Sequence, residues 1–307
     1  MVYIGEILSI GVAFSWTAGA LLSEYGSKRW GNLTLNTILT ALALVFYLVL
    51  FKIATGSFVP AAASSTTMWW LMLSGFVGYV LCDYCLFQSY IVIGARYGLL
   101  FMTLAPLAAA LMAWIILGQQ LTAISILAML ITLSGIGISV LGRGGSHKVS
   151  LKLPRNGVLL AIGAAMFQGI GLVLSKIGLN HYEVSATGAP GWLIPFYANF
   201  YRCMVGCIGF AILMYFRIGV APLRQAMHDR KGLMAVAANA IFGPFVGVAL
   251  SLMAIQYTAA GIASTLMGMT PIIILLPSYW LFHEKITYRA VIGAVISVAG
   301  VSIFFLG

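Results

Sequence analysis

Hydrophobic residues run continuously for about 20 positions at a time along most of this chain, and short polar or Gly/Pro-containing breaks separate the runs. A helix needs about 20 apolar residues to cross the hydrocarbon core of a bilayer, which is about 30 Å thick. The strands of a membrane barrel would instead alternate apolar and polar residues over about 10 positions. The pattern therefore predicts an all-α integral membrane protein with ten transmembrane helices, at residues 3–22, 33–52, 69–91, 97–116, 122–141, 155–177, 193–216, 232–256, 262–282 and 287–306.

The two halves of the chain repeat each other. Similar residues recur at offsets of 165 and 152 positions, namely Pro106 with Pro271, Gly78 with Gly243 and, at the shorter offset, Gly19 with Gly171. We therefore expect two five-helix repeats, at residues 1–141 and 155–307, joined by a basic cytoplasmic linker at 142–154. Because five is odd, the second repeat enters the membrane in the opposite direction. Inverted repeats are typical of transporters, which bind their substrate near the bilayer midplane between the repeats.

Composition and charge support a membrane protein and exclude a nucleic-acid-binding one. Hydrophobic residues make up 62% of the chain and charged residues 7%, against about 25% charged in soluble domains. The net charge of +10 comes from loops on one side: 13 of the 16 Lys and Arg residues follow the odd-numbered helices, whereas Lys52 and Lys176 follow even-numbered ones. The positive-inside rule then places both termini outside the cytoplasm of a multi-pass protein in the cell membrane.

One acidic residue falls well inside a predicted span. Asp83 lies in the third span, and helical spacing puts Tyr79, Phe87 and Tyr90 on the same face. A charge at this depth is costly, so the carboxyl must be neutral, paired or exposed to water. This face could bind an amino group or relay a proton; alternatively, Asp83 is hydrogen-bonded within helix packing.

Arg202 is the basic counterpart, in the seventh span. It could hold a substrate carboxylate bidentately, or it could be a structural arginine that reaches out to the membrane surface or bonds helix ends. Further candidates for the cavity wall are the polar and aromatic residues Trp16, Tyr97, Gln168 and Asn239. Each could equally be an interhelical hydrogen bond or a packing contact.

Three prolines interrupt predicted spans. Pro106, Pro271 and Pro244 would each remove a backbone hydrogen bond in mid-helix and free a carbonyl. In a membrane such a break is tolerated where it lines protein or a water-filled cavity. We expect these residues at hinges or at the cavity wall, with simple packing kinks as the alternative.

The sequence resembles the drug/metabolite transporter superfamily, specifically its ten-helix EamA-like exporters. The resemblance rests on Ala254-x-x-Tyr257, on Thr270-Pro271 and on Phe282-His283-Glu284-Lys285-Ile286-Thr287, and it extends over essentially the whole chain. Gln119 departs from the family pattern, which has an acidic residue there, and the family's usual cytoplasmic termini differ from the orientation that the loop charges predict. The resemblance implies export of amino acids or similar small metabolites by alternating access.

These features favour a secondary transporter of small molecules over other classes. A nucleotide-sugar or sugar-phosphate exchanger would need several basic residues in its spans, and a drug transporter of the same superfamily is a further alternative. An intramembrane enzyme would need a nucleophile with a base, clustered acids or metal ligands at membrane depth, and the sequence offers none. We therefore expect no catalytic residues, no metal and no cofactor, with a small-molecule substrate and the lipid bilayer as partners; a monomer is compatible with the sequence.

Overall fold

The computed structural model describes residues 3–117, 122–143, 149–151, 153–185, 190–257, 266–283 and 286–306. Helices dominate it, as the continuous apolar runs require. The first half contains α1 (Ile4–Trp30), α2 (Asn32–Thr55), α3 (Ser65–Gly75), the π-helix η1 (Phe76–Leu81), α4 (Cys82–Ile93), α5 (Ala95–Met102), α6 (Ala105–Leu117) and α7 (Ala123–Val140). A short antiparallel hairpin, β1 (Leu141–Arg143) with β2 (Val149–Leu151), follows it and is a small departure from the expected all-α fold.

The second half repeats this order. It contains α8 (Arg155–Ser185), the 3-10 helix η2 (Gly191–Leu193), α9 (Ile194–Ile218), α10 (Ala221–Met227), α11 (Arg230–Ala240), the π-helix η3 (Ile241–Phe245), α12 (Val246–Tyr257), α14 (Thr270–Ile273), α15 (Leu275–Phe282) and α16 (Tyr288–Leu306). The two π-helices begin 165 positions apart, and so do α6 and α14. The irregularities of the fold therefore follow the sequence repeat.

Six helical stretches in the described residues are long and apolar enough to cross a membrane, and four more are shorter apolar helices. Large apolar side chains such as Phe14, Leu130 and Ile212 are exposed on the outside of the bundle, as expected where lipid is the solvent. Several helices extend beyond the predicted spans. The largest corrections are α1, which runs to Trp30 instead of ending at residue 22, and α8, which runs to Ser185 instead of ending at residue 177.

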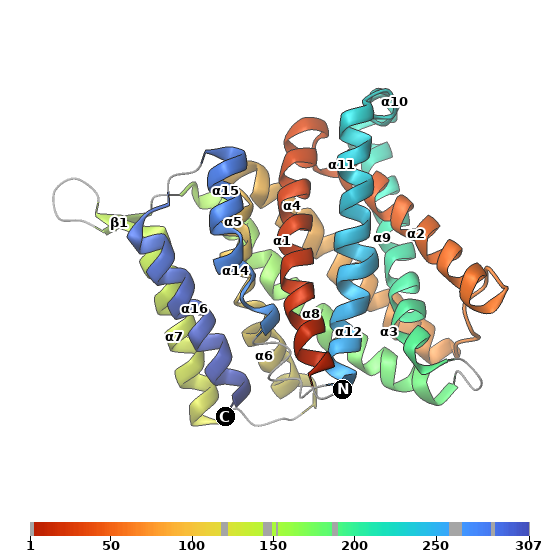
Figure 1. The fold of residues 1–307 in the computed structure, drawn as a ribbon, viewed down its shortest axis with the longest axis horizontal. Helices are drawn as coiled ribbons and strands as arrows, with labels where there is room; N and C mark the ends of the chain where they lie inside the picture. The colour runs from red at the N-terminus through yellow and green to blue at the C-terminus, as the bar shows by residue number, and fades with distance from the viewer. Residues whose placement is uncertain are drawn as a thin grey trace.

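The halves pack around an approximate two-fold relation. α1 packs on α12, η3 and α11, while its repeat counterpart α8 packs on α4, α3 and η1. α2 packs on α9, and α7 packs on α16. Figure 1 shows both chain ends at one end of the bundle, and β1 and α10 toward the other. That second end holds Lys28 and Arg29 at the end of α1 and Arg217 at the end of α9.

Close helix contacts depend on small residues at the crossings. A Cβ added at Gly135 of α7 would lie 2.5 Å from the backbone nitrogen of Ser297 and 2.7 Å from the carbonyl oxygen of Gly293, both on α16. One added at Gly75 of α3 would lie 2.6 Å from the carbonyl oxygen of Arg202. Since membrane helices associate mainly through such close packing, glycines at these positions fix how near the neighbouring backbones come.

Candidate functional site

A cavity of about 330 Å³ lies between the two repeats. Its wall combines residues of α1, η1, α4 and α5 with residues of α8, α9, η3 and α14. Most residues that the sequence pointed to meet here: Trp16, Tyr79, Asp83, Phe87, Tyr90, Pro106, Gln168, Arg202, Asn239, Pro244 and Pro271. Residues from both halves of the chain therefore line one shared cavity.

Asp83 lies in the first turn of α4, directly after the π-helix η1. Phe87 and Tyr90 follow on the same face, and their rings stack with centroids 5.6 Å apart. The carboxylate is partly exposed to the cavity, and no hydrogen bond or ion pair to it occurs within the described residues. Asp83 is thus an acid at membrane depth whose oxygens are available to a bound cation or proton.

Arg202 is 5% exposed, so the alternative in which it reaches out to the membrane surface is wrong. Its guanidinium lies 5.5 Å from the centre of the Tyr79 ring, and Nη1 donates to Asn199 Oδ1 at 3.5 Å. Small residues bring α9 this close to η1, because a Cβ at Gly206 would lie 2.9 Å from Cβ of Tyr79. Arg202 is therefore a buried cation at the cavity wall.

Asp83 and Arg202 interact electrostatically without forming an ion pair. Among the described residues that line the cavity, Asp83 is the one acidic residue and Arg202 is the one basic residue. The wall consequently presents one carboxyl group and one guanidinium group separately, together with the rings of Tyr79, Phe87 and Tyr90. Such an arrangement can bind a molecule that carries both charges, because each charge then gains a partner.

Apart from Arg202, the polar side chains of the second-repeat wall named here are neutral. Asn239 Nδ2 donates to Ser23 Oγ at 2.8 Å across the repeat interface. On the first-repeat side, the Cys82 thiol donates to Gln168 Oε1 at 3.5 Å. These contacts are interhelical hydrogen bonds, and the same side chains also line the cavity.

Several lining residues escaped the sequence analysis. They are small hydroxyl residues within the spans: Ser23, Thr40, Thr103, Ser251 and Thr270. Four of these hydroxyls donate to a carbonyl three or four positions earlier in their own helix, as Thr103 does to Leu100 at 2.7 Å. Such residues are common in membrane helices, so their sequence carries no signal that distinguishes a cavity wall from any other helix face.

All three prolines line the cavity, but Pro106 and Pro271 are not mid-helix breaks. Pro106 and Pro271 each lie second in a new helix, α6 and α14, directly after a two-residue interruption of the span. Proline fits the first turn of a helix because its missing N–H has no partner there anyway. The expectation of a lost hydrogen bond was therefore wrong for this pair. Pro244 does lie inside a helical stretch, in η3.

Tyr97 is the residue that the structure places elsewhere. It is not among the residues that line the cavity. Its ring lies 4.5 Å from the Arg96 guanidinium and packs on a separate apolar cluster that includes Ile93 and Leu100. Gln119, Glu284 and Lys285 lie outside the described residues.

A buried acid that the sequence analysis missed lies just above the cavity, in the part of α1 beyond residue 22. Glu24 is 0% exposed; it accepts the Ala95 backbone N–H at 2.7 Å and pairs with Lys28. The Lys28 ammonium in turn lies 5.1 Å from the centre of the Phe282 ring at the end of α15. Glu24 thereby links α1 to the start of α5 and, through Lys28, to the ninth predicted span.

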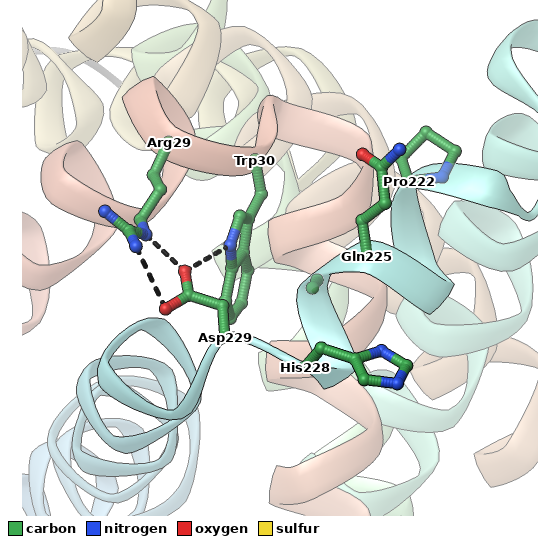
Figure 2. Close-up of a pocket in the computed structure, with 7 residues that line it drawn as sticks. Arg29, Trp30, Pro222, Gln225, His228 and Asp229 are labelled. Atoms are coloured by element: carbon green, nitrogen blue, oxygen red, sulfur yellow. Dashed lines mark hydrogen bonds and ion pairs between the residues drawn. The ribbon is translucent and has the colours of Figure 1, made fainter.

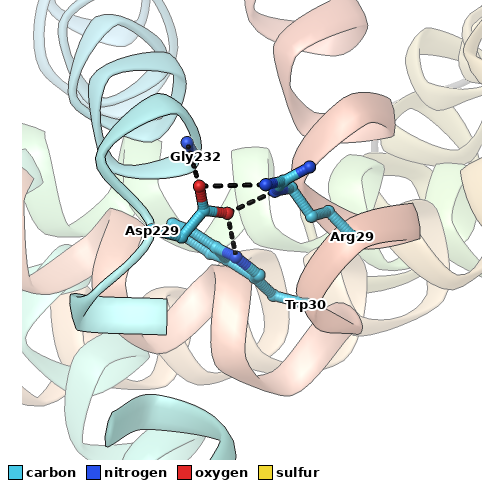
Figure 3. A network of polar contacts seen from close by, with 4 residues as sticks. All are labelled: Arg29, Trp30, Asp229 and Gly232. Carbon is cyan, nitrogen blue, oxygen red and sulfur yellow. Dashed lines mark hydrogen bonds and ion pairs between the residues drawn. The ribbon is translucent and has the colours of Figure 1, made fainter. Parts of the chain in front are cut away.

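The last residues of α1 also bind the loop before α11. Arg29 pairs with Asp229, and Trp30 Nε1 donates to the same carboxylate at 3.0 Å. Asp229 also accepts the Gly232 N–H at 3.1 Å as the N-cap of α11 (Figure 3). The neighbouring guanidinium and these N–H donors hold the pKa of Asp229 well below its ordinary value. We call the Glu24–Ala95 and Arg29–Trp30–Asp229 contacts the α1 clasp.

A second pocket of about 550 Å³ opens beside the clasp, at the surface. Figure 2 shows Arg29 and Trp30 facing Asp229, with Gln225 and His228 beside them. Its one lining acid and one lining arginine are already bonded to each other. The pocket is therefore a surface depression whose charges are satisfied, unlike the central cavity.

Comparison with known proteins gives a family and a fold. The EamA-like transporter family matches residues 3–141 and, a second time, residues 155–306. No match is found among curated proteins. A solved structure described as "Crystal structure of protein" aligns with a TM-score of 0.63 and 16% sequence identity, over 99% of this chain and 96% of that chain. At this identity the likeness supports the fold alone.

Proposed function

The chain belongs to the EamA-like transporter family, and from that premise we propose that it is a secondary transporter that exports amino acids or similar small zwitterionic metabolites. Ten spans in two inverted repeats would surround the central cavity, which would open alternately to each side of the membrane. Export as the direction rests on the resemblance of the chain to exporters.

The presence of Asp83 and Arg202 in one cavity, without an ion pair between them, carries this proposal. An amino acid places an ammonium and a carboxylate a short distance apart, and each would find a partner of opposite charge at this wall. The cavity volume of about 330 Å³ lies within the range of small-molecule sites, about 300–1,000 Å³. The aromatic rings of Tyr79, Phe87 and Tyr90 would enclose the apolar part of the substrate.

The same observation weighs against the alternatives within transport. A sugar phosphate or nucleotide sugar carries several negative charges, whereas the lining residues offer one guanidinium. A cationic drug would pair with Asp83 and leave Arg202 buried without an anion, which is costly. We assign no chemical step to the cavity.

We further propose that both termini lie outside the cytoplasm of the cell membrane, because the basic residues gather at the opposite end of the bundle. One chain would be the transport unit, since both walls of the cavity come from the same chain. A fluorescent reporter that folds only in the cytoplasm, fused to either terminus, would be expected to stay dark. A bright reporter at both ends would contradict the orientation.

Counterflow of a radiolabelled amino-acid panel into proteoliposomes, with and without a pH gradient, tests the function. We expect saturable uptake of at least one amino acid, and loss of the response to pH in Asp83→Asn, because the variant has no carboxyl to carry a proton through the cavity. Glu6→Gln, near the start of α1 and away from the cavity, is the matched control.

Absence of uptake for every amino acid by folded, inserted protein would refute the substrate class. Unchanged pH dependence in Asp83→Asn, with uptake intact, would remove the proton-carrying role of this residue and leave facilitated transport.

A further inference from the structure

Asn199 of α9 connects Arg202, the cavity cation on the same helix, to elements of both repeats. The residue is 0% exposed, and its side chain makes four hydrogen bonds. Oδ1 accepts from the Tyr79 hydroxyl at 3.1 Å and from Arg202 Nη1 at 3.5 Å. Nδ2 donates to the Tyr47 hydroxyl at 2.7 Å and to the Pro244 carbonyl at 2.9 Å. Both ends of the amide are therefore fully engaged, which fixes its orientation.

The network reaches three other elements from this single residue. Tyr79 belongs to η1, Tyr47 to α2 and Pro244 to η3. The Tyr47 hydroxyl donates to the same Pro244 carbonyl at 2.7 Å. A carbonyl of the second-repeat π-helix is thus held by two donors. This π-helix is the repeat counterpart of the one that carries Tyr79.

Arg202 receives only neutral partners from this network. Its Nε is buried without a hydrogen-bond partner, and the guanidinium has the Asn199 oxygen and the Tyr79 ring beside it. Arginine has five N–H donors in a planar fork, so most of its donors are not used by the described residues. A guanidinium in this condition is a strong bidentate site for a carboxylate.

We infer that Asn199 is a positioning residue for substrate recognition: it holds the Arg202 guanidinium at the cavity wall without neutralising it. The amide is essential to this role, because a carboxylate at the same place would pair with Arg202 and compete with the substrate. Through its bonds to Tyr47 of the first repeat and Pro244 of the second, Asn199 also fixes the guanidinium relative to α2 and η3. The inference rests on the proposed function, in which Arg202 binds the carboxylate of the substrate.

The variant Asn199→Asp tests it, because it keeps the shape and adds the competing charge. Binding is measured by ligand-induced thermal stabilisation and transport by counterflow, with leucine and its decarboxylated analogue isoamylamine as probes. We expect the leucine Kd and KM to rise about tenfold or more, kcat to change little, and the amine to bind as in the wild type. The matched control is Asn36→Asp, a 0% exposed asparagine of α2 that does not line the cavity.

A second variant keeps the inference testable if Asn199→Asp does not fold. Asn199→Ser removes the support without adding charge, and we expect a smaller rise in the leucine KM, again with amine binding unchanged. Equal losses for leucine and amine in the folded variants, or the same probe selectivity in Asn36→Asp, would overturn the inference.

The proposed function is judged separately, by amino-acid counterflow of the wild-type protein. If the wild-type protein takes up amino acids but the Asn199 variants lose leucine and amine binding equally, the positioning role alone is refuted. Failure of leucine, acetate and pyruvate to stabilise the wild-type protein would overturn the inference too, since Arg202 would then bind no carboxylate.

Discussion

Gly19 of α1 and Gly171 of α8 are repeat equivalents, and each packs against the π-helix of the other repeat. Alternating access by inverted repeats would exchange the geometries of these two crossings. Adding a methyl group at either one should therefore favour opposite conformations. We consider the single variants Gly171→Ala and Gly19→Ala.

The two crossings differ in the observed conformation. A Cβ at Gly171 would lie 3.0 Å from Cα of Gly78, whereas a Cβ at Gly19 would lie 3.5 Å from Cα of Gly243 and 3.3 Å from the side-chain oxygen of Asn239. Carbon atoms pack best at about 3.5–4.0 Å. The methyl group at Gly171 must therefore push backbones apart, while that at Gly19 nearly fits.

Overpacking typically costs about 1–3 kcal/mol. Alanine also has a higher helix propensity than glycine, but this does not change the free-energy difference between the two conformations, because residues 19 and 171 stay helical in both. A difference of about 1–2 kcal/mol corresponds to about a 5- to 30-fold change in the ratio of conformations. Gly171→Ala should deplete the observed conformation by this factor, and Gly19→Ala should enrich it.

The assay is the reaction of a cysteine at the cavity wall with an impermeant maleimide, added to each side of oriented proteoliposomes. Met102→Cys, in a background where Cys82, Cys85, Cys203 and Cys207 are replaced by alanine, supplies the reporter. The two glycine variants should shift the labelling ratio in opposite directions.

The control is Gly11→Ala, because no atom of the described residues lies within 4 Å of a Cβ at that position. Shifts in the same direction for Gly19→Ala and Gly171→Ala, or shifts no larger than that of the control, would refute the exchange of the two crossings.

Three further predictions concern stability, each measured by thermal unfolding in detergent. Arg29 lowers the pKa of Asp229 in the folded protein, so the ionised carboxylate stabilises the fold above about pH 4. This stabilisation is lost as the pH falls below the ordinary pKa near 3.9. Asp229→Asn should therefore flatten the loss of stability in this range. Gly135→Ala should destabilise by about 1–3 kcal/mol, because its methyl group would meet the backbone of α16. Glu24→Ala should destabilise by about 1–3 kcal/mol, since it leaves the buried Ala95 N–H without an acceptor.

Each of these predictions has an outcome that contradicts it. An unchanged acid profile in Asp229→Asn would mean that the charge of Asp229 contributes nothing to folding stability. If Gly135→Ala changed the stability in the same way as the control Gly11→Ala, the backbones of α7 and α16 would be able to move apart without cost. Glu24→Gln, which keeps an acceptor for Ala95, should be milder than Glu24→Ala; equal effects would assign the loss to the charge instead.

The helical segments and the repeat could be predicted from the sequence because both are encoded along the chain. The apolar runs place the helices, and the fixed offset of 165 positions holds down to the paired π-helices and the paired starts of α6 and α14. Helical periodicity also places Tyr79, Asp83, Phe87 and Tyr90 on one face, and that face does line the cavity.

The sequence could not reveal what depends on contacts between distant segments. Glu24 was missed because its partner Ala95 lies 71 positions away, and Tyr97 was misplaced because the chain turns at Gly94, whose φ of 82° is one that few residues other than glycine adopt.

The surroundings of Arg202 depend on tertiary structure in the same way. Asn199 lies beside it in the sequence, but Tyr79 and Pro244 come from opposite repeats. The sequence alone was enough to place Tyr79, Asp83, Phe87 and Tyr90 on one helix face, because helical periodicity is local. Only the folded arrangement decided that Asp83 and Arg202 share one cavity without pairing, because that outcome is set by how closely α9 approaches the end of α3 at Gly75 and η1 at Gly206.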